Sequence, residues 1–251
     1  MQLFNHAAVD LLPDAILFDF DGTLYPYEHA HQAALNSVSR FAERRIGVAS
    51  DSFSHAYAEA RKHVQKILHT SPSKYNRLLY FQSAFEQLGL GSQVNIMMEF
   101  ERLYWQRFME NMQVDDEVYD FFDELRRIGI PAAIVTNQVA DVQMRKLTFW
   151  ELHDYFRCVI TSEEVGHNKP HPAIFNRAVE KLGCQGKHVW MVGDCPETDL
   201  AGAKQALGAT TVLRSYEKSI PNAFEVDLRI DRLSDLLPFI TSKHVKKTSA
   251  A

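Results

Sequence analysis

Short apolar segments that each stop at small or polar residues recur along the chain, and they constrain its fold more than any other feature. The first is 15–20 (AILFDF), which runs into acids and Gly22. A short continuous apolar run that ends in a turn signal is typical of a strand buried on both faces. Further segments of the same form predict strands at 131–135, 158–160, 188–192 and 209–213.

Helical patterns lie between these segments. Apolar residues recur at helical spacing in each of them, and a glycine follows the last turn, as at many helix ends. The predicted helices are 116–128, 172–182 and 197–207. Apolar strands that alternate with helices predict a parallel sheet covered on both faces. Right-handed crossovers then give a doubly wound, Rossmann-like α/β core.

The segment from about 25 to 115 interrupts this alternation. It shows no convincing strand and is rich in helix formers and aromatic residues. Because it is too long for a loop, we predict a helical cap domain inserted after the first strand. The predicted boundaries are 1–24 and 116–242 for the α/β core, 25–115 for the cap and 243–251 for a flexible, polar tail.

Composition excludes several classes of protein. The 251 residues are 46% hydrophobic and 24% charged, which is ordinary for a globular chain that builds its own core. The formal net charge of −5 favours neither a nucleic acid polymer nor an anionic membrane as partner. No run approaches the length of a membrane span. Three scattered cysteines and an N-terminus without signal-peptide features predict a cytoplasmic protein.

Polar clusters lie near the carboxyl ends of four predicted strands, where open α/β sheets bind ligands. They are Asp19 to Thr23, Thr136-Asn137, Lys169-Pro170 and Gly193 to Asp199. The third follows its strand at the end of a loop, and the others follow directly. We expect the sheet to gather these clusters into one site.

Carboxylates dominate two of the clusters. Asp19 and Asp21 are two residues apart and repel each other, so burying both costs free energy unless cations compensate. Asp194 follows another strand and supplies a further carboxylate. Oxygen ligands without nearby histidine or cysteine favour Mg²⁺. Asp199, five residues later, is predicted to brace the metal ligands from behind rather than to bind the metal.

The same clusters fit phosphoryl transfer. The side chains of Lys169, Thr136 and Asn137 can hold phosphoryl oxygens. Attack by Asp19 would form an acyl phosphate and divide one difficult step into two easier ones. Asp21 can protonate the leaving alcohol and then activate a water.

The motifs DFDGTLYP, TN, KP and GDCPETD resemble those of the haloacid dehalogenase-like hydrolase superfamily, in order and across most of the chain. The resemblance implies that Asp19 is the nucleophile and that Asp21 is the acid/base, with its backbone carbonyl on the metal. It implies that Thr136 and Lys169 hold the phosphoryl group and that Asp194 binds Mg²⁺. The insert resembles the helical cap of the phosphoglycolate phosphatase and nucleotidase branch, whose opening and closing gate water and select the substrate.

Asp21 separates the branches of this superfamily. Dehalogenases carry a non-acidic residue, usually Tyr, two places after the nucleophile, whereas phosphatases and phosphomutases need an acid there. The expected function is therefore Mg²⁺-dependent hydrolysis of a small phosphorylated metabolite, such as a nucleotide or sugar phosphate, by a monomer or homodimer. A phosphomutase of the β-phosphoglucomutase type is the alternative, followed by a 2-haloacid dehalogenase and a catalytically silent binding module.

Several other residues are weaker candidates for a functional role. His29 and His31 are expected to be ordinary polar positions on the first cap helix, and Cys195 is expected to be a packing residue. The candidates for substrate contact in the cap and at its entrance are Tyr25, Tyr27, Lys74, Tyr75, Arg77 and Arg107. Most residues of these kinds are solvated or structural, so only one or two of them are expected to matter.

Overall fold

The computed structural model divides the chain into two compact units. It describes residues 1–214, 216 and 225–241. One unit is Pro26–Gln113, and the other combines Met1–Tyr25 with the chain from Val114 onward. The predicted divisions, after 24 and before 116, lie within two residues of these. The predicted flexible tail, 243–251, lies outside the described residues.

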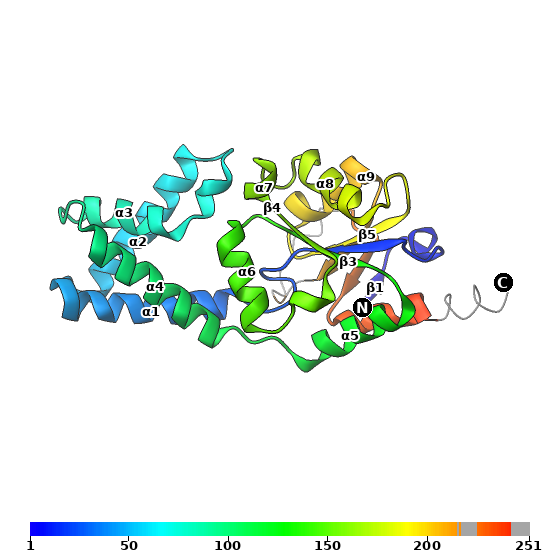
Figure 1. Ribbon diagram of the computed structural model, residues 1–251, viewed down its shortest axis with the longest axis horizontal. Helices are drawn as coiled ribbons and strands as arrows, with labels where there is room; N and C mark the ends of the chain where they lie inside the picture. Colours follow the sequence, from blue (N-terminus) through cyan, green and yellow to red (C-terminus); the bar gives the residue numbers. More distant parts are fainter. Residues whose placement is uncertain (215, 217–224, 242–251) are drawn as a thin grey trace. The chain divides into compact units, whose positions relative to one another are not determined.

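A seven-stranded sheet forms the centre of the unit that combines Met1–Tyr25 with the chain from Val114 onward, which is called the α/β unit below (Figure 1). Its strands are β1 (Gln2–Leu3), β2 (Ala15–Phe18), β3 (Ala132–Thr136), β4 (Cys158–Thr161), β5 (Val189–Gly193), β6 (Thr210–Arg214) and β7 (Leu228–Ile230). Their order across the sheet is β1-β7-β6-β5-β2-β3-β4, and every pair is parallel except β1 with β7. After β2 the chain adds strands on one side and then on the other. The predicted doubly wound α/β fold is confirmed.

Helices cover both faces of this sheet, and all four residues of β2 are therefore buried. The helices of this unit are α5 (Asp116–Ile128), α6 (Ala140–Phe149), α7 (Ser162–Val165), α8 (Pro172–Leu182) and α9 (Ala201–Leu207). Leu17 packs in the cluster that contains Phe175 of α8 and Ala203 of α9. The next residue, Phe18, points to the opposite face and packs edge-on against Phe122 of α5. Figure 1 shows α5 and α8 on opposite sides of the strands.

Short irregular elements complete the unit and account for part of the difference from the sequence prediction, which also lacked α6 and α7. They are the 3₁₀ turns His6–Val9, His153–Tyr155 and Leu233–Leu236 and a π-helical turn, Pro196–Leu200. The predicted helix 197–207 is therefore a π turn followed by α9. Strands β1 and β7 went unpredicted because two or three residues are too few to show a periodicity.

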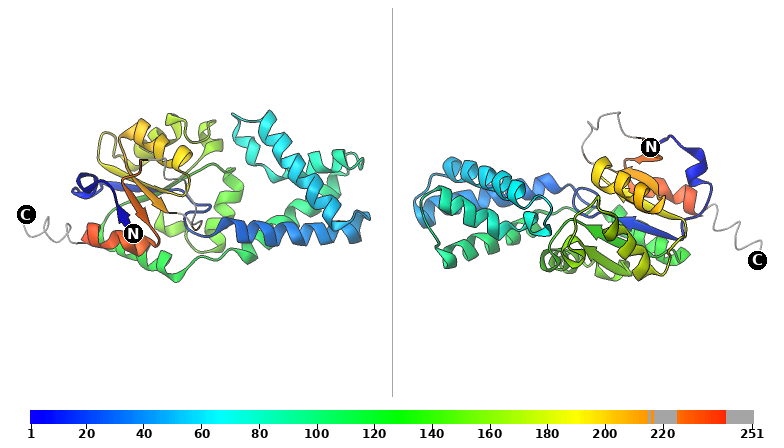
Figure 2. Two further views of the ribbon diagram at one scale, coloured as in Figure 1. Left: turned by 180° about the vertical axis from the view of Figure 1, so that it is seen from behind. Right: turned by 90° about the horizontal axis from the view of Figure 1, so that it is seen from above.

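The second unit, Pro26–Gln113, is entirely helical. Its elements are α1 (Tyr27–Ile46), α2 (Ser50–Ile67), a 3₁₀ turn (Pro72–Tyr75), α3 (Arg77–Gln87) and α4 (Val94–Asn111). α1 packs against α4 and α2 against α3, and Figure 2 shows the first pair running alongside each other. The core of the unit is aromatic, with Phe81 and Phe100 fully buried. Across the parts of both units that the structure describes, no helix has the length and apolar character needed to cross a bilayer.

Candidate active site

The predicted site residues converge at the carboxyl edge of the sheet, beside its central strand. β2 lies between β3 and β5, so Asp19, directly after β2, lies beside the last residues of two neighbouring strands, Thr136 and Gly193. The chain turns from one side of the sheet to the other at β2, and ligands bind at such a reversal in open α/β sheets. The predicted gathering of distant clusters into one place therefore follows from the strand order.

Lys169 and Asp19 form the centre of the site. Lys169 Nζ donates to Asp19 Oδ1 at 2.5 Å and to the Val135 carbonyl at 2.8 Å, and it pairs with Asp199 Oδ1 at 2.9 Å. Thr23 Oγ1 donates to the other oxygen of Asp19 at 3.1 Å. All of these side chains are buried. The nucleophile predicted from the sequence is thus held through both oxygens.

Asn137 acts on Lys169 through the backbone. Its Oδ1 accepts from the Lys169 N–H at 2.7 Å, and its Nδ2 donates to the Lys169 carbonyl at 3.3 Å. This two-point contact fixes the loop that carries the lysine, which ends in a cis peptide bond to Pro170. Thr136, its neighbour, is 2% exposed at the end of β3. The sequence predicted phosphate binding for both residues, and that role stays a prediction.

Two glycines let the remaining carboxylates approach closely. A Cβ on Gly22, which has a φ of 90°, would overlap the Asp194 carboxylate, and a Cβ on Gly193 would overlap Asp199. As a result, oxygens of Asp19, Asp194 and Asp199 lie within 4.8 Å of one another. The π turn directs Asp199 back toward β5, where it accepts from the Cys195 N–H at 3.1 Å. Asp199 is thereby tied to the lysine and the backbone, as a bracing residue would be.

Burial sets the charge state of this cluster. Loss of solvent raises the pKa of Asp19 to about 6, since it outweighs the attraction of Lys169. Loss of solvent, followed by repulsion from Asp19 and Asp199, raises the pKa of Asp194 to about 9. Burial alone would lower the pKa of Lys169, but the two neighbouring carboxylates raise it above its ordinary value. The lysine therefore stays charged, while the carboxylates lack compensating cations.

Asp21 has a separate partner that the sequence did not indicate. Lys146 Nζ, on α6, donates to both carboxylate oxygens of Asp21, at 2.7 and 2.8 Å. The Tyr25 hydroxyl also donates to Asp21 Oδ1. Neither α6 nor Lys146 was predicted, and the contact could not be, because the lysine lies 125 residues from Asp21 in the chain. The Asp21 carboxylate therefore pairs with Lys146, whereas the Asp19 carboxylate pairs with Lys169.

The balance of charge fits a divalent cation. Asp19, Asp21, Asp194 and Asp199 face two lysines, Lys146 and Lys169, which leaves two negative charges when all are ionised. The groups that remain for a metal are carboxylate oxygens, the ligands that Mg²⁺ prefers. Burial of unpaired carboxylates costs free energy, and a bound dication removes that cost. The donor set therefore suits the predicted Mg²⁺.

The candidates in the helical unit have mostly structural surroundings. Arg77 is buried, donates to the Tyr27 hydroxyl and the Tyr75 carbonyl, and lies over aromatic rings. His31, expected to be an ordinary polar position, is 5% exposed and hydrogen-bonded to the Tyr104 hydroxyl, so that expectation was wrong. Three further candidates occupy more open positions. Lys74 lies over the Tyr75 ring, Arg107 pairs with the exposed Glu110, and His29 is exposed.

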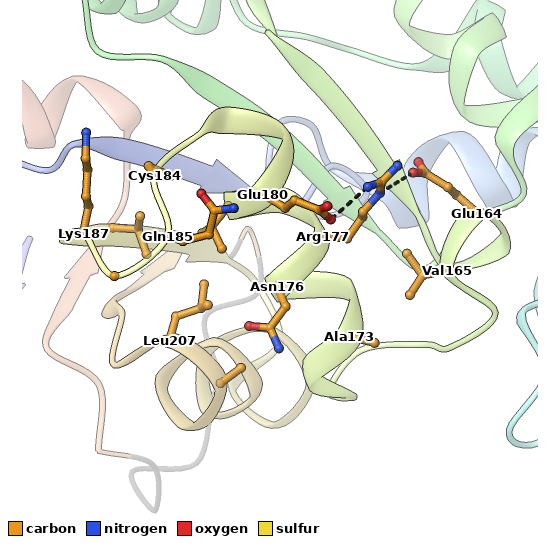
Figure 3. Close-up of a pocket in the computed structure, with 14 residues that line it drawn as sticks. Glu164, Val165, Ala173, Asn176, Arg177, Glu180, Cys184, Gln185, Lys187 and Leu207 are labelled. Carbon is orange, nitrogen blue, oxygen red and sulfur yellow. Dashed lines mark hydrogen bonds and ion pairs between the residues drawn. The ribbon is translucent and has the colours of Figure 1, made fainter.

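A cavity of about 670 Å³ lies elsewhere in the α/β unit, between α8, α9 and β5 (Figure 3). Its wall includes Asn176, Cys184 and Leu207, and a line of charge formed by Arg177 between Glu164 and Glu180. None of the predicted site residues lines it. The cavity is therefore separate from the carboxylate and lysine cluster.

An α/β core with carboxylates and lysines at the carboxyl edge of its sheet defines a class of hydrolase. Residues 13–206 match the family model described as haloacid dehalogenase-like hydrolase. The chain belongs to this family, and the resemblance noted in the sequence is confirmed. Among curated proteins, it is 33% identical to ribulose-1,5-bisphosphate 5-phosphatase of Halopiger xanaduensis over 79% of this chain and 83% of that one. It is 29% identical to glyceraldehyde 3-phosphate phosphatase of Methanopyrus kandleri over 90% and 96%. With such relatives, the enzyme is a phosphatase of the family.

Solved structures agree on the fold. A haloacid dehalogenase-type phosphatase from Thermococcus onnurineus superposes with a TM-score of 0.70 at 26% identity, over 90% of this chain and 97% of that one. A 2-haloacid dehalogenase from Pseudomonas syringae superposes almost as well, with a TM-score of 0.69 at 20% identity over 93% and 99%. The fold therefore does not separate the two chemistries. That separation depends on site residues, and the sequence prediction assigns it to the acid at position 21.

Proposed function

We propose that this enzyme is a Mg²⁺-dependent phosphomonoesterase that forms an aspartyl phosphate on Asp19 and acts on a small phosphorylated metabolite. One observation carries the proposal: Asp19 is held against Lys169, while Asp21, two residues after Asp19, is held by a different lysine, Lys146. One carboxylate is thus fixed beside a phosphoryl-binding cation, and the other is kept apart for proton transfer. We also propose a cytoplasmic location, since all three cysteines are free thiols.

The chemistry divides into two balanced steps. An Asp19 oxygen attacks phosphorus, the bond from phosphorus to the leaving oxygen breaks, and Asp21 gives that oxygen a proton. Water then attacks the phosphorus of the acyl phosphate and returns a proton to Asp21, and the bond to Asp19 breaks. Lys169 holds phosphoryl oxygens in both steps. Mg²⁺, bound by Asp19, Asp194 and the Asp21 carbonyl, would supply charge neutralisation at the phosphoryl group.

Sugar phosphates are the substrate class that the relatives favour. Two of the long matches, at 33% and 29% identity, are named for phosphatases of ribulose-1,5-bisphosphate and glyceraldehyde 3-phosphate. We therefore propose a phosphorylated sugar or triose as substrate, ahead of a nucleotide. A panel that contains sugar phosphates, triose phosphates and nucleoside monophosphates separates these classes.

The test measures phosphate release across that panel with Mg²⁺ and with EDTA. We expect release only with Mg²⁺, and a loss of at least about 10³-fold in Asp19→Asn, because the amide keeps the volume but cannot attack. Asp141→Asn is the matched control, since this exposed acid on α6 lies outside the cluster. Borohydride reduction of quenched enzyme should convert residue 19 to homoserine, which mass spectrometry identifies. Release that persists in Asp19→Asn, or in EDTA, contradicts the proposal, and transfer to a second sugar phosphate faster than to water favours a mutase.

A further inference from the structure

Lys146 is a buried lysine in the α/β unit that no sequence motif marks. Its side chain is 0% exposed, whereas the adjacent Arg145 on α6 is 60% exposed and pairs with Asp141. Lysine is rarely buried without a partner, because desolvation of the ammonium group costs free energy. A lysine in this position needs an anion, and the structure shows which one it has.

Three contacts from two segments fix the Asp21 carboxylate. Lys146 Nζ reaches both oxygens, at 2.7 and 2.8 Å, and the Tyr25 hydroxyl donates to one of them. Tyr25 is itself fully buried, with its ring edge-on to Phe20, and its hydroxyl lies 3.4 Å from Lys146 Nζ. The carboxylate therefore has one preferred orientation. Its side chain remains 21% exposed, so it is still open to an exchange of protons.

An ion pair of this kind could serve only to anchor α6. Buried ion pairs are weak evidence for stability, however, since well-packed apolar residues often serve equally well. The position of this pair favours a role in the reaction, because Asp21 lies two residues from Asp19 and the two lysines divide the two aspartates between them. Lys169 contacts Asp19 and Asp199, and Lys146 contacts Asp21.

We infer that Lys146, assisted by Tyr25, is a positioning residue that holds Asp21 in the orientation needed for proton transfer to the leaving oxygen. The inference rests on the proposed phosphatase chemistry, in which Asp21 is the acid/base. Proton transfer in the transition state requires donor and acceptor within hydrogen-bond reach, and a small misplacement slows it strongly. Lys146 acts through Asp21 and has no assigned contact with substrate.

The experiment compares two esters that differ in their need for an acid. A sugar phosphate releases an alkoxide, which must be protonated, whereas p-nitrophenyl phosphate releases a stable phenolate. Lys146→Met keeps the length of the side chain and removes its charge. We expect kcat/KM for the best sugar phosphate to fall roughly 10²-fold and kcat/KM for p-nitrophenyl phosphate to fall by less than about threefold. Arg145→Met, the adjacent exposed cation, should leave both values unchanged.

Equal losses with both esters would overturn the inference, because a structural role lowers every activity alike. In the Asp21→Asn background, Lys146→Met should add little further loss, and additive losses would contradict a role that acts through Asp21. If Lys146→Met does not fold, Lys146→Arg and Tyr25→Phe carry the test, since each keeps most of the packing and disturbs the same contacts. A wild-type enzyme with no phosphatase activity overturns the proposed function and this inference together, whereas an active wild type with an unchanged ester ratio overturns the inference alone.

Discussion

The two units of this protein bury positive charge in opposite ways. In the α/β unit, Lys169 and Lys146 each contact carboxylates that are themselves buried or half-buried. In the helical unit, Arg77 is 5% exposed and forms no ion pair among the described residues. Its guanidinium instead donates to hydroxyl and carbonyl oxygens and lies over the rings of Tyr80, Tyr104 and Trp105.

The neighbours of Arg77 are kept neutral. Burial, followed by the charges of Arg77 and Arg61, lowers the pKa of His31 to about 3, and burial raises the pKa of Tyr104 above its ordinary value. Aromatic faces and neutral oxygens can stabilise a cation without reacting. Charge in the α/β unit is arranged as the proposed reaction requires, with carboxylates left short of cations. Charge in the helical unit is arranged for structure.

The largest expected difference between the two units is in the free energy of unfolding when Lys169 or Arg77 loses its charge. Lys169→Met leaves Asp19 and Asp199 without their partner, so we expect a loss of about 3–5 kcal/mol in the free energy of unfolding without Mg²⁺. Arg77→Met leaves only neutral phenols and a carbonyl unpaired, so we expect a loss of about 1–3 kcal/mol. Urea unfolding of both variants gives the two values. A larger loss for Arg77→Met would contradict the view that the lysine carries the greater electrostatic burden.

The pH dependence of stability should have opposite signs in the two units. His31 has its folded-state pKa below the unfolded value, so its contribution is present above about pH 6.5 and is lost as the pH falls toward 3. Asp194 has its folded-state pKa raised, so its contribution is present below about pH 4 and is lost as the pH rises toward 9. Each proton changes stability by about 1.4 kcal/mol per pH unit within these windows.

Hydrogen exchange resolved by peptide, in EDTA, measures this difference. Relative to the intrinsic exchange rate at each pH, acid should lower protection in the helical unit, and alkali should lower protection in the α/β unit. His31→Gln should weaken the acid effect, while His63→Gln, at an exposed histidine of the same unit, should not. Asp194→Asn should weaken the alkaline effect, with Asp141→Asn as its control. Identical pH profiles in both units would contradict the assignment of these groups.

The smallest effects concern one unpaired polar side chain in each unit. The Gln143 amide and the Tyr57 hydroxyl are buried and have no hydrogen-bond partner among the described residues. Since an unpaired buried polar group costs free energy, Gln143→Met and Tyr57→Phe should change stability by less than about 1 kcal/mol or raise it. Thermal unfolding measures this. A variant that stays stable but loses phosphatase activity would instead mark its residue as part of the reaction.

Much of the α/β unit was accessible from the sequence. The helices 116–128 and 172–182 were predicted with the bounds that α5 and α8 have, and the five adjacent strands β2 to β6 were predicted to within two residues. The reason is local: apolar runs, helical periods and terminal glycines record the environment of each segment. Asp19, Thr136, Lys169 and Asp194 were predicted as site residues because the edge of a parallel sheet gathers whatever follows its strands.

The rest was decided by tertiary structure, because it depends on contacts between segments far apart in the chain. Lys146 meets Asp21 across 125 residues, and nothing near Lys146 in the sequence predicts that contact. Arg77 lies on a helix that the sequence places in the cap, but the aromatic rings around it come from two helices, α3 and α4. The sequence by itself determined the alternation of five strands with helices along the chain, and it placed the Asp19 carboxylate at the end of the first of those strands. Only the folded chain decided which cation each charge would have, since pairing depends on distance in space and on burial.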